Sequence, residues 1–378
     1  MISSLIGEQL VRDAQRLIEG AKKIVILTHM APDGDAMGSS LGLRWWLEEM
    51  GKAVTVAVPS AFPDFLGWMP GAEDILVYDI SGESAVCGQI RNAIEEADLA
   101  ICADFNEPKR IGAVGTMLIE VKGEGDPKNQ QIFRGSPGER NKEEGDLPIL
   151  MIDHHPNPSD VADVVLSYPE SPSASEIVYR LIYEMKGQLS LNAATCLYTG
   201  MMTDTGNFAF NSNHPEMYEI VGEMVRLGVD KDAIYNRVFN AYSESRMRLM
   251  GFCLYQKMRI FPKEHVAFIY LSKRELARFH FQSGDAEGLV NLPLQIRDIH
   301  YSCFMREDKV YPSEEEKAGG SKIKVKISMR SQGDRPVNTF CQEVFGGGGH
   351  KNASGGEYYG PLPEAVKLFL ENYQRYCK

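Results

Sequence analysis

The fold is decided by the stretch Ile149-Leu150-Met151-Ile152-Asp153-His154-His155. Its four apolar residues follow a Gly/Asp/Pro break and predict a strand buried on both faces, as is typical of a parallel sheet. An acid and two histidines end the strand, where open α/β sheets bind their ligands. Because a single histidine after a strand is usually a hydrogen-bonded structural residue, a functional interpretation requires the same pattern elsewhere in the chain.

The pattern of a buried element that ends in potential ligands recurs three times. Residues 24–27 and 99–103 are apolar strand-like runs, and residues 193–202 read as an apolar helix. Because the carboxyl ends of parallel strands share one edge of a sheet, we expect the polar residues that follow to meet. These residues are His29, Asp33, Asp35, Asp104, Asp153, His154, His155 and Asp204.

This combination of imidazoles and carboxylates predicts a metal centre. Imidazole with several carboxylates suits Mn²⁺, Fe²⁺ or Zn²⁺ better than Ca²⁺, whose sites consist of oxygen. About six such ligands are enough for two ions about 3.5–4 Å apart, the arrangement used in phosphoryl transfer. A structural alternative stays open for Asp33 and Asp35, since either residue could cap the helix predicted to start near Met37 or Gly38.

A glycine run near the C-terminus is the second signal. Gly346, Gly347, Gly348 and Gly349 precede His350. Such glycines allow a close backbone approach or offer N–H groups to an anion; the alternative is a flexible linker. Arg330 ends a predicted strand and could bind two phosphate oxygens, although a lone arginine is equally often a surface residue.

Composition limits the classes of function. The chain has 378 residues, which predicts two domains, and its 43% hydrophobic and 24% charged residues are typical of a soluble globular protein. No membrane-spanning run or signal peptide is evident, and seven dispersed cysteines indicate reduced thiols, so we expect a cytoplasmic protein. A net charge of −12 counts against long duplex nucleic acid but leaves short nucleotides as partners.

The coarse order of elements predicts an α/β fold in two parts. A parallel sheet with helices on both faces fills the N-terminal part, and a helical stretch runs from about residue 231 to 257. Strand-like segments at 266–271, 296–305 and 322–329 and helices at 336–345 and 363–376 predict a smaller mixed α/β domain. The polar segments 121–148 and 307–321 read as surface excursions whose role the sequence does not reveal.

The motifs together resemble a known family. Residues 28–40, 104–112, 153–155 and 204–208 resemble, in order and spacing, the four motifs of the DHH phosphoesterases, and residues 345–356 resemble the glycine-rich motif of the associated C-terminal domain. The resemblance implies a five-stranded parallel catalytic domain over 1–230, a helical linker over 231–260 and a substrate-binding domain over 261–378. It also implies two Mn²⁺ ions, hinge closure between the domains, and leaves a homodimer open.

The resemblance further implies individual residue roles. His29 and Asp33 would hold one Mn²⁺, Asp35, His154 and Asp204 the other, and Asp104 would bridge them. Asp153 would orient a histidine, and His155 would face the substrate phosphate or leaving oxygen. The residues implied for the substrate's far end are Arg330, Gly347, Gly348, Gly349 and His350.

The leading hypothesis is therefore a phosphoesterase in which two-metal-activated hydroxide attacks phosphorus. The resemblance implies that it hydrolyses oligoribonucleotides a few residues long and dephosphorylates 3′-phosphoadenosine 5′-phosphate. One alternative is a phosphodiesterase of cyclic or linear dinucleotides. Another, from a different class, is a non-catalytic nucleotide sensor.

Overall fold

The computed structural model describes residues 4–79, 84–122, 147–282, 284–308 and 323–377. The chain divides into two compact units, Met1–Ala241 and Tyr242–Lys378. A parallel sheet with helices forms the first unit and a mixed sheet the second, so the predicted fold class is confirmed. In the described part of the chain, no helix is both long and apolar enough to span a bilayer.

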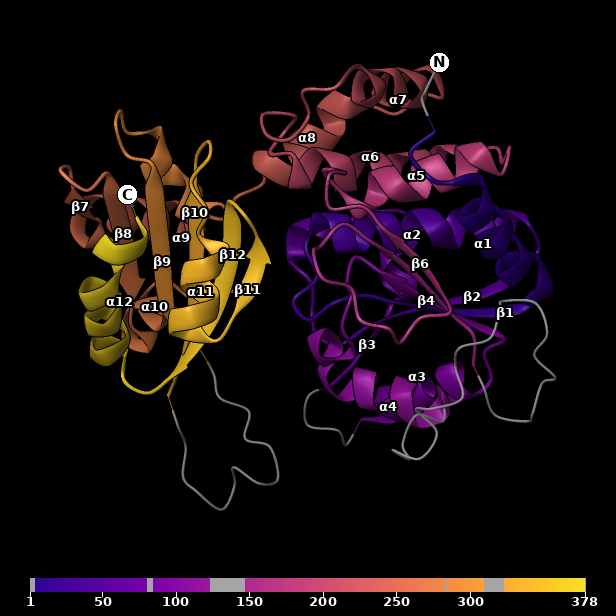
Figure 1. The fold of residues 1–378 in the computed structure, drawn as a ribbon, viewed down its shortest axis with the longest axis horizontal. Helices are drawn as coiled ribbons and strands as arrows, with labels where there is room; N and C mark the ends of the chain where they lie inside the picture. The colour runs from indigo at the N-terminus through magenta and orange to yellow at the C-terminus, as the bar shows by residue number, and fades with distance from the viewer. Residues whose placement is uncertain (1–3, 80–83, 123–146, 283, 309–322, 378) are drawn as a thin grey trace. The chain divides into compact units, whose positions relative to one another are not determined.

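The N-terminal unit contains a six-stranded parallel sheet with the strand order β3-β2-β1-β4-β5-β6 (Figure 1). Its strands are β1 (Lys23–Leu27), β2 (Ala53–Val58), β3 (Leu76–Val77), β4 (Leu99–Ala103), β5 (Ile149–Asp153) and β6 (Val164–Ser167). The resemblance implied five strands, and this expectation was wrong by one. The short β3 adds an edge strand because Leu76 and Val77 pair with the end of β2.

Helices cover both faces of this sheet, because alternate residues of its buried strands project to opposite sides. Ile24 and Ile26 pack into the core beneath one helical layer, whereas Val25 and Leu27 pack into the core beneath the other. The first layer contains α1 (Glu8–Gly20), α2 (Gly34–Glu49) and α5 (Ala174–Glu184), and α6 (Leu191–Asp204), α7 (Pro215–Arg226) and α8 (Lys231–Phe239) pack with it. The second contains α3 (Ala85–Glu95) and α4 (Gly112–Lys122) (Figure 1).

Helix α2 starts at Gly34, one turn before the predicted start near Met37. The Asp33 carboxylate caps it, since Oδ1 accepts hydrogen bonds from the backbone N–H groups of Asp35 (3.0 Å) and Ala36 (3.1 Å). Asp33 is therefore the N-cap of α2, as the structural alternative predicted. The cap also sets the direction in which the first turn of α2 carries Asp35.

Three glycines, at Gly34, Gly38 and Gly42, form one face of α2 and pack against α6. A Cβ atom on Gly38 would lie only 2.6 Å from the carbonyl oxygen of Cys196, and one on Gly34 would overlap the side chain of Thr203. The missing side chains let the two helices approach closely. This approach brings the first turn of α2 next to the C-terminal end of α6.

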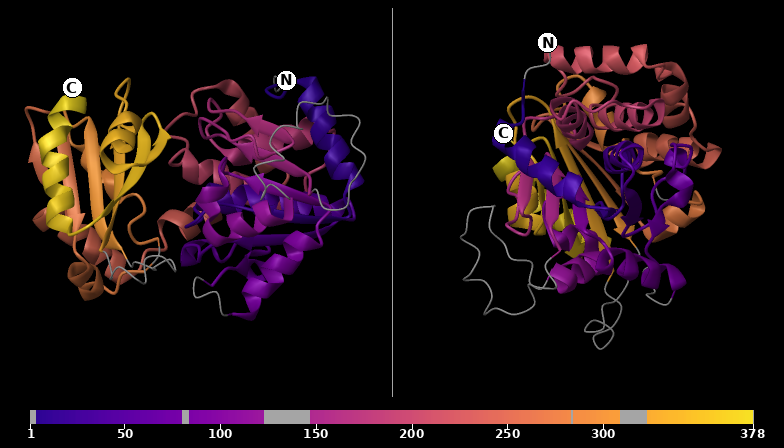
Figure 2. Two further views of the ribbon diagram at one scale, coloured as in Figure 1. Left: turned by 60° about the horizontal axis from the view of Figure 1, so that its bottom comes forward. Right: turned by 90° about the vertical axis from the view of Figure 1, so that its right-hand side faces the viewer.

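The C-terminal unit contains a six-stranded sheet with the order β11-β12-β10-β9-β8-β7, in which only β8 and β9 are parallel neighbours. Its strands are β7 (Arg259–Phe261), β8 (Val266–Leu271), β9 (Tyr301–Asp308), β10 (Lys324–Ser331), β11 (Gly348–His350) and β12 (Ala353–Tyr359). Helices α11 (Asn338–Phe345) and α12 (Leu362–Tyr376) pack on the face that Val325, Ile327 and Met329 present. In Figure 2 the yellow α12 runs along these strands.

A second core in the same unit forms around Ile269, Leu271 and Phe304. It takes up side chains of α9 (Glu244–Phe252), α10 (Lys273–Arg278) and the 3₁₀ segment Leu289–Gln295. The prediction of a strand from residue 296 was wrong at its start, because β9 begins only at Tyr301.

The single helix predicted from 231 to 257 was also wrong. Helix α8 ends at Phe239, and α9 begins anew after Ser243, whose hydroxyl accepts a hydrogen bond from the N–H of Arg246 (3.0 Å). A π-helical turn, Cys253–Lys257, follows. Of the two polar excursions, residues 123–146 and 309–322 lie outside the described residues, whereas residues 121 and 122 end α4.

Candidate metal centre

The predicted ligands gather at the centre of the N-terminal sheet, where β1 and β4 are neighbours. The chain leads away from this pair of strands in opposite directions, towards β2 and towards β5, and such a switch point is where open α/β sheets bind ligands. Register pairs Leu27 with Cys102 and Ala103 with Ile152. The residues that follow β1, β4 and β5 therefore leave the sheet side by side.

Three groups of potential ligands share Asp104, and the ligand atoms within each group lie within 4.8 Å of one another. Two of them consist of predicted metal ligands: one contains His29 and Asp33, the other Asp35 and His154. The third contains Asp153 and His155. Asp104 contacts both histidines, with Oδ2 3.3 Å from Nε2 of His29 and Oδ1 3.3 Å from Nε2 of His154. Its backbone has a φ of 62°, which is rare for a residue with a side chain and is typical of functional sites.

Asp204, at the end of α6, approaches the second group. Its Oδ2 lies 3.4 Å from Nε2 of His154, and Oδ2 of Asp35 lies 3.8 Å from the same nitrogen. All six predicted metal ligands are thus brought to one place, from three strand ends and two helices.

Both histidines present the same ring nitrogen to the carboxylates. Nδ1 of His29 lies 3.0 Å from the carbonyl oxygen of Met30, and Nδ1 of His154 lies 3.2 Å from that of Ser171. A carbonyl oxygen fixes a proton on Nδ1 and so leaves the Nε2 lone pair of a neutral imidazole for a metal ion.

The segment from Ser171 to Ser175 supports two of the ligands and was missed by sequence reasoning. The carbonyl of Ser171 holds His154 as described, and the N–H groups of Ala174 and Ser175 donate hydrogen bonds to the Asp35 carboxylate (2.6 and 2.9 Å). These amides begin α5, where the helix dipole favours a negative charge. Because these contacts are made by backbone atoms, no pattern of side chains in the sequence could reveal them.

Asp153 lies against His155 as the resemblance implied for an orienting acid. Its Oδ1 accepts a hydrogen bond from His155 Nδ1 (2.8 Å) and its Oδ2 accepts one from the His155 backbone N–H (3.0 Å). Asn106 steadies the following turn, since its amide donates to the carbonyl oxygen of Pro156 (2.9 Å). Asn106 was also missed, although its position two residues after Asp104 is a usable signal.

The close packing of charges shifts the pKa values of the cluster. Burial opposes the charged form of His29, but the hydrogen bond to Asp104 and the charges of Asp33 and Asp104 outweigh it and raise its pKa to about 9. Burial and then the charge of Asp104 raise the pKa of Asp35 to about 7. Burial likewise raises the pKa of Asp204 well above its ordinary value. Burial would raise the pKa of Asp104, yet the close contacts with His154 and His29 and the positive charges of the two rings hold it well below its ordinary value.

These residues fit a pair of divalent cations. Four carboxylates converge on two imidazoles, and burying several like charges is costly unless a cation compensates them. Asp35 is only 1% exposed and Asp104 only 2%. Mixed oxygen and imidazole donors match Mn²⁺, Fe²⁺ or Zn²⁺.

The residues predicted to bind substrate lie together in the C-terminal unit. Arg330 on β10 pairs with Ala353 on β12, and Ala353 pairs with His350 on β11. Because directly paired residues of adjacent strands project from the same face, Arg330 and His350 share one face of the sheet. This face is opposite to the one on which α11 and α12 pack, since Arg330 alternates with Met329.

The glycine run leads from the C-cap of α11 into the first strand of a β-hairpin, so the linker alternative was wrong. Gly348 and Gly349 are part of β11. A side chain at Gly347 would overlap the carbonyl group of Gly355, and Gly349 has a φ of 136°. Close approach of β12 therefore explains two of the four glycines.

The chain also resembles known proteins. The model of the DHH family, N-terminal domain, matches residues 23–124, which include His29, Asp33, Asp35 and Asp104. A protein from Thermus thermophilus named bifunctional oligoribonuclease and PAP phosphatase NrnA is 28% identical over 368 residues, 96% of this chain and 92% of that protein. The Bacillus subtilis protein of the same name is 24% identical and covers 94% of this chain and 95% of its own length.

A solved structure is similar over the whole chain. The crystal structure of an exopolyphosphatase-related protein from Bacteroides fragilis is 42% identical, covers 99% of this chain and 98% of its own, and has a TM-score of 0.81. The resemblance that the motifs indicated is confirmed. The chain belongs to the DHH family.

Proposed function

We propose that this protein is a Mn²⁺-dependent phosphoesterase that hydrolyses short oligoribonucleotides and dephosphorylates 3′-phosphoadenosine 5′-phosphate. The observation that carries the proposal is the convergence of two histidines and four aspartates, with Asp104 in contact with both histidines. The names of the Thermus and Bacillus relatives combine both reactions. Each reaction breaks a phosphate ester, so one site serves both.

Six side chains would hold the ions. His29 and Asp33 would bind one ion, Asp35, His154 and Asp204 the other, and Asp104 both. When bound, such ions supply Lewis-acid polarisation of a phosphoryl oxygen and neutralise negative charge. The chain's own contribution is to pre-orient the ligands, through the cap at Asp33 and the amides of Ala174 and Ser175 on Asp35.

His155 would act on the substrate itself. Oδ1 of Asp153 accepts a hydrogen bond from Nδ1–H of His155, which fixes the tautomer and the plane of the ring. We assign to Nε2 of His155 a hydrogen bond to the substrate phosphate or proton donation to the leaving oxygen. Asp153 then serves catalysis through His155.

The C-terminal unit would bind a substrate phosphate or terminal nucleotide. Arg330 and His350 share a sheet face, and a guanidinium can donate two parallel hydrogen bonds to a phosphate. The amides of Gly348 and Gly349 would add anion-binding donors, whereas Gly347 cannot contribute as predicted, because its N–H already donates to the carbonyl oxygen of Cys341 (3.0 Å). The net charge of −12 favours such local contacts over a broad basic surface.

A substrate panel tests this function. The full-length protein is freed of metal, restored with Mn²⁺, and given di- to pentaribonucleotides, 3′-phosphoadenosine 5′-phosphate, a cyclic dinucleotide and inorganic polyphosphate in parallel. We expect turnover of the first two, abolished by chelation and by Asp104→Asn. Comparable turnover of the cyclic dinucleotide would instead identify a dinucleotide phosphodiesterase. Tight nucleotide binding without any turnover in saturating Mn²⁺ would instead identify a sensor.

A further inference from the structure

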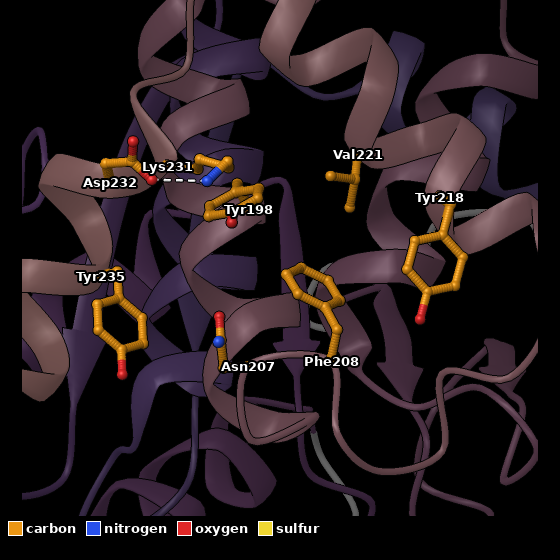
Figure 3. A pocket seen from close by; sticks show the side chains of 8 residues that line it. All are labelled: Tyr198, Asn207, Phe208, Tyr218, Val221, Lys231, Asp232 and Tyr235. Atoms are coloured by element: carbon orange, nitrogen blue, oxygen red, sulfur yellow. Dashed lines mark hydrogen bonds and ion pairs between the residues drawn. The ribbon is translucent and has the colours of Figure 1, made fainter.

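The N-terminal unit has a second site candidate, a hollow of about 400 Å³ formed by α6, α7, α8 and the turn that follows α6 (Figure 3). None of the six proposed metal ligands lines it. Asn207, in its wall, follows Asp204 by only three residues. Its volume lies within the range of about 300–1,000 Å³ usual for small-molecule sites.

The turn in its wall has an unusual backbone that fixes two of the lining residues. Gly206, Asn207 and Phe208 have φ values of 56°, 60° and 61°, although left-handed residues normally occur singly. The hydroxyl of Thr205 accepts a hydrogen bond from the N–H of Phe208 (2.9 Å) and donates one to the carbonyl of Met201 (2.6 Å). The positions of Asn207 and Phe208 are therefore set by the fold before any ligand binds.

Four of the eight lining residues carry aromatic rings. The ring of Phe208 lies between those of Tyr198 (5.7 Å between centroids) and Tyr218 (6.5 Å), while Tyr235 stands on the other side of Asn207 (Figure 3). Tyr218 is 54% exposed and Tyr235 38%. Exposed rings around a hollow are the surfaces on which planar ligands stack.

Two polar groups in the wall have no partner in the described part of the chain. Tyr198 is only 2% exposed, yet its hydroxyl makes no hydrogen bond to another described residue, and the same holds for the side-chain amide of Asn207. Burial raises the pKa of Tyr198 to about 12, so the hydroxyl remains a proton donor at neutral pH. The hydroxyl oxygen is not fully buried, so it can donate a hydrogen bond to an acceptor on a ligand in the hollow.

The charges at the site favour an uncharged ligand. Lys231, the cation in the lining, lies 2.6 Å from Oδ1 of Asp232, another lining residue. A paired lysine offers little net charge to a phosphate. Stacking rings, a hydroxyl donor and an amide that both donates and accepts instead match the face and edge of a heterocyclic base.

We propose that this hollow binds the base of a nucleoside or nucleotide, stacked between the aromatic rings and hydrogen-bonded to Tyr198 and Asn207. The choice of nucleotides as the ligand class rests on the proposed function. The site would recognise a base through contacts that require neither the phosphate nor the metal ions.

Isothermal titration of the metal-free, full-length protein with adenosine, guanosine, cytidine and uridine tests this site, with ribose as the control that lacks a base. We expect at least one nucleoside to bind and ribose not to bind. Asn207→Ala and Tyr235→Ala should weaken binding by about 10-fold, the order of one lost stacking or base-edge contact. Tyr255→Ala, at a tyrosine that is 89% exposed and does not line the hollow, is the matched control.

The outcomes separate this site from the phosphoesterase function. The titration contains neither phosphate nor metal. If nucleosides bind but the protein shows no Mn²⁺-dependent hydrolysis, the proposed function is wrong and the proposed base-binding site still stands. Absence of binding by all four nucleosides, or equal binding by Asn207→Ala and wild type, would overturn the site whatever the hydrolysis result. Should Tyr235→Ala fail to fold, Tyr198→Phe, which removes one oxygen, must still weaken binding.

Discussion

Gly200 of α6 lies directly against Asp35 of α2, so that a Cβ atom on Gly200 would stand 2.8 Å from the Oδ1 atom of that carboxylate. It would also overlap the hydroxyl group of Ser175, whose backbone N–H donates to the same oxygen. A proposed metal ligand is thus positioned by a glycine that carries no functional group. The contact links helix packing to the chemistry of the site.

Gly200→Ala should therefore impair metal binding. The methyl group must displace Asp35 or Ser175, and a displaced ligand weakens the site. We expect Mn²⁺ affinity to fall at least about 10-fold, the lower range for loss of a group that supports a metal ligand. Isothermal titration with Mn²⁺ measures it.

Gly88→Ala is the matched control, because Gly88 lies in helix α3 and a Cβ atom there meets nothing within 4 Å. It should keep wild-type Mn²⁺ affinity and gain about 1 kcal/mol of stability from helix propensity. Wild-type Mn²⁺ affinity in a folded Gly200→Ala protein would show that this contact does not position Asp35.

Alanine substitutions at Gly38 and Gly42, two glycines of α2 that face α6, should lower the stability of the protein to different extents. At Gly38 a methyl group would meet backbone atoms of α6, including the Cys196 oxygen at 2.6 Å, whereas at Gly42 it would meet the side chain of Leu197. A side chain can rotate away and a helix backbone cannot. We expect Gly38→Ala to lower the free energy of unfolding by about 1–3 kcal/mol or more and Gly42→Ala by less, as urea denaturation would measure; the reverse order would contradict the close helix approach.

Asp153→Asn should separate catalysis from metal binding. Asp153 holds His155 through both carboxylate oxygens and is not a proposed metal ligand. An asparagine cannot accept both hydrogen bonds in the same way, so the tautomer and orientation of His155 are lost. We expect kcat to fall by about 100-fold while Mn²⁺ stoichiometry stays at wild type. If the variant instead loses bound Mn²⁺, we would conclude that Asp153 is itself a metal ligand.

The stability of the metal-free protein should depend on pH in a defined direction. Asp35 has a pKa of about 7 instead of 3.8, and His29 about 9 instead of 6.5, so the folded state holds protons that the unfolded state releases. Stability is thus lost as pH rises, first through Asp35 up to about pH 7 and then through His29 up to about pH 9.

Thermal unfolding in EDTA and in saturating Mn²⁺, measured from pH 5 to pH 9, checks this dependence. We expect Tm to fall with pH in EDTA and the gap between the two curves to widen, because the cations replace the lost protons. A metal-free Tm that rises across this interval would show that the cluster does not hold these protons.

Much of the fold and of the site could be predicted because their signals are local. Continuous apolar runs identify β1, β4 and β5, whose carboxyl ends must meet in a parallel sheet. That geometry predicts that the polar residues after these strands meet, and the resemblance to the family then selected the six ligands among the candidates. The start of α2 was predicted less accurately, because it depends on a single N-cap residue, Asp33.

Other features depend on partners distant in the sequence and gave no pattern to read. The amides of Ala174 and Ser175 hold an aspartate about 140 positions earlier. Gly200 is informative only once α2 is known to lie against it. The glycines before His350 could be recognised as functional or structural only when β12 was found beside them.

The initial rate of diribonucleotide hydrolysis by the wild-type protein and by Asp104→Asn, each in Mn²⁺ and in EDTA, tests the central claim most directly. Asp104 contacts both histidines of the cluster, and the asparagine keeps its shape while removing the charge. The account predicts turnover by the wild type in Mn²⁺ alone and a loss of more than about 100-fold in the variant, beyond the effect of a group that only supports a ligand. Turnover that persists in EDTA, or a variant as fast as the wild type, would contradict a metal-dependent phosphoesterase at this site.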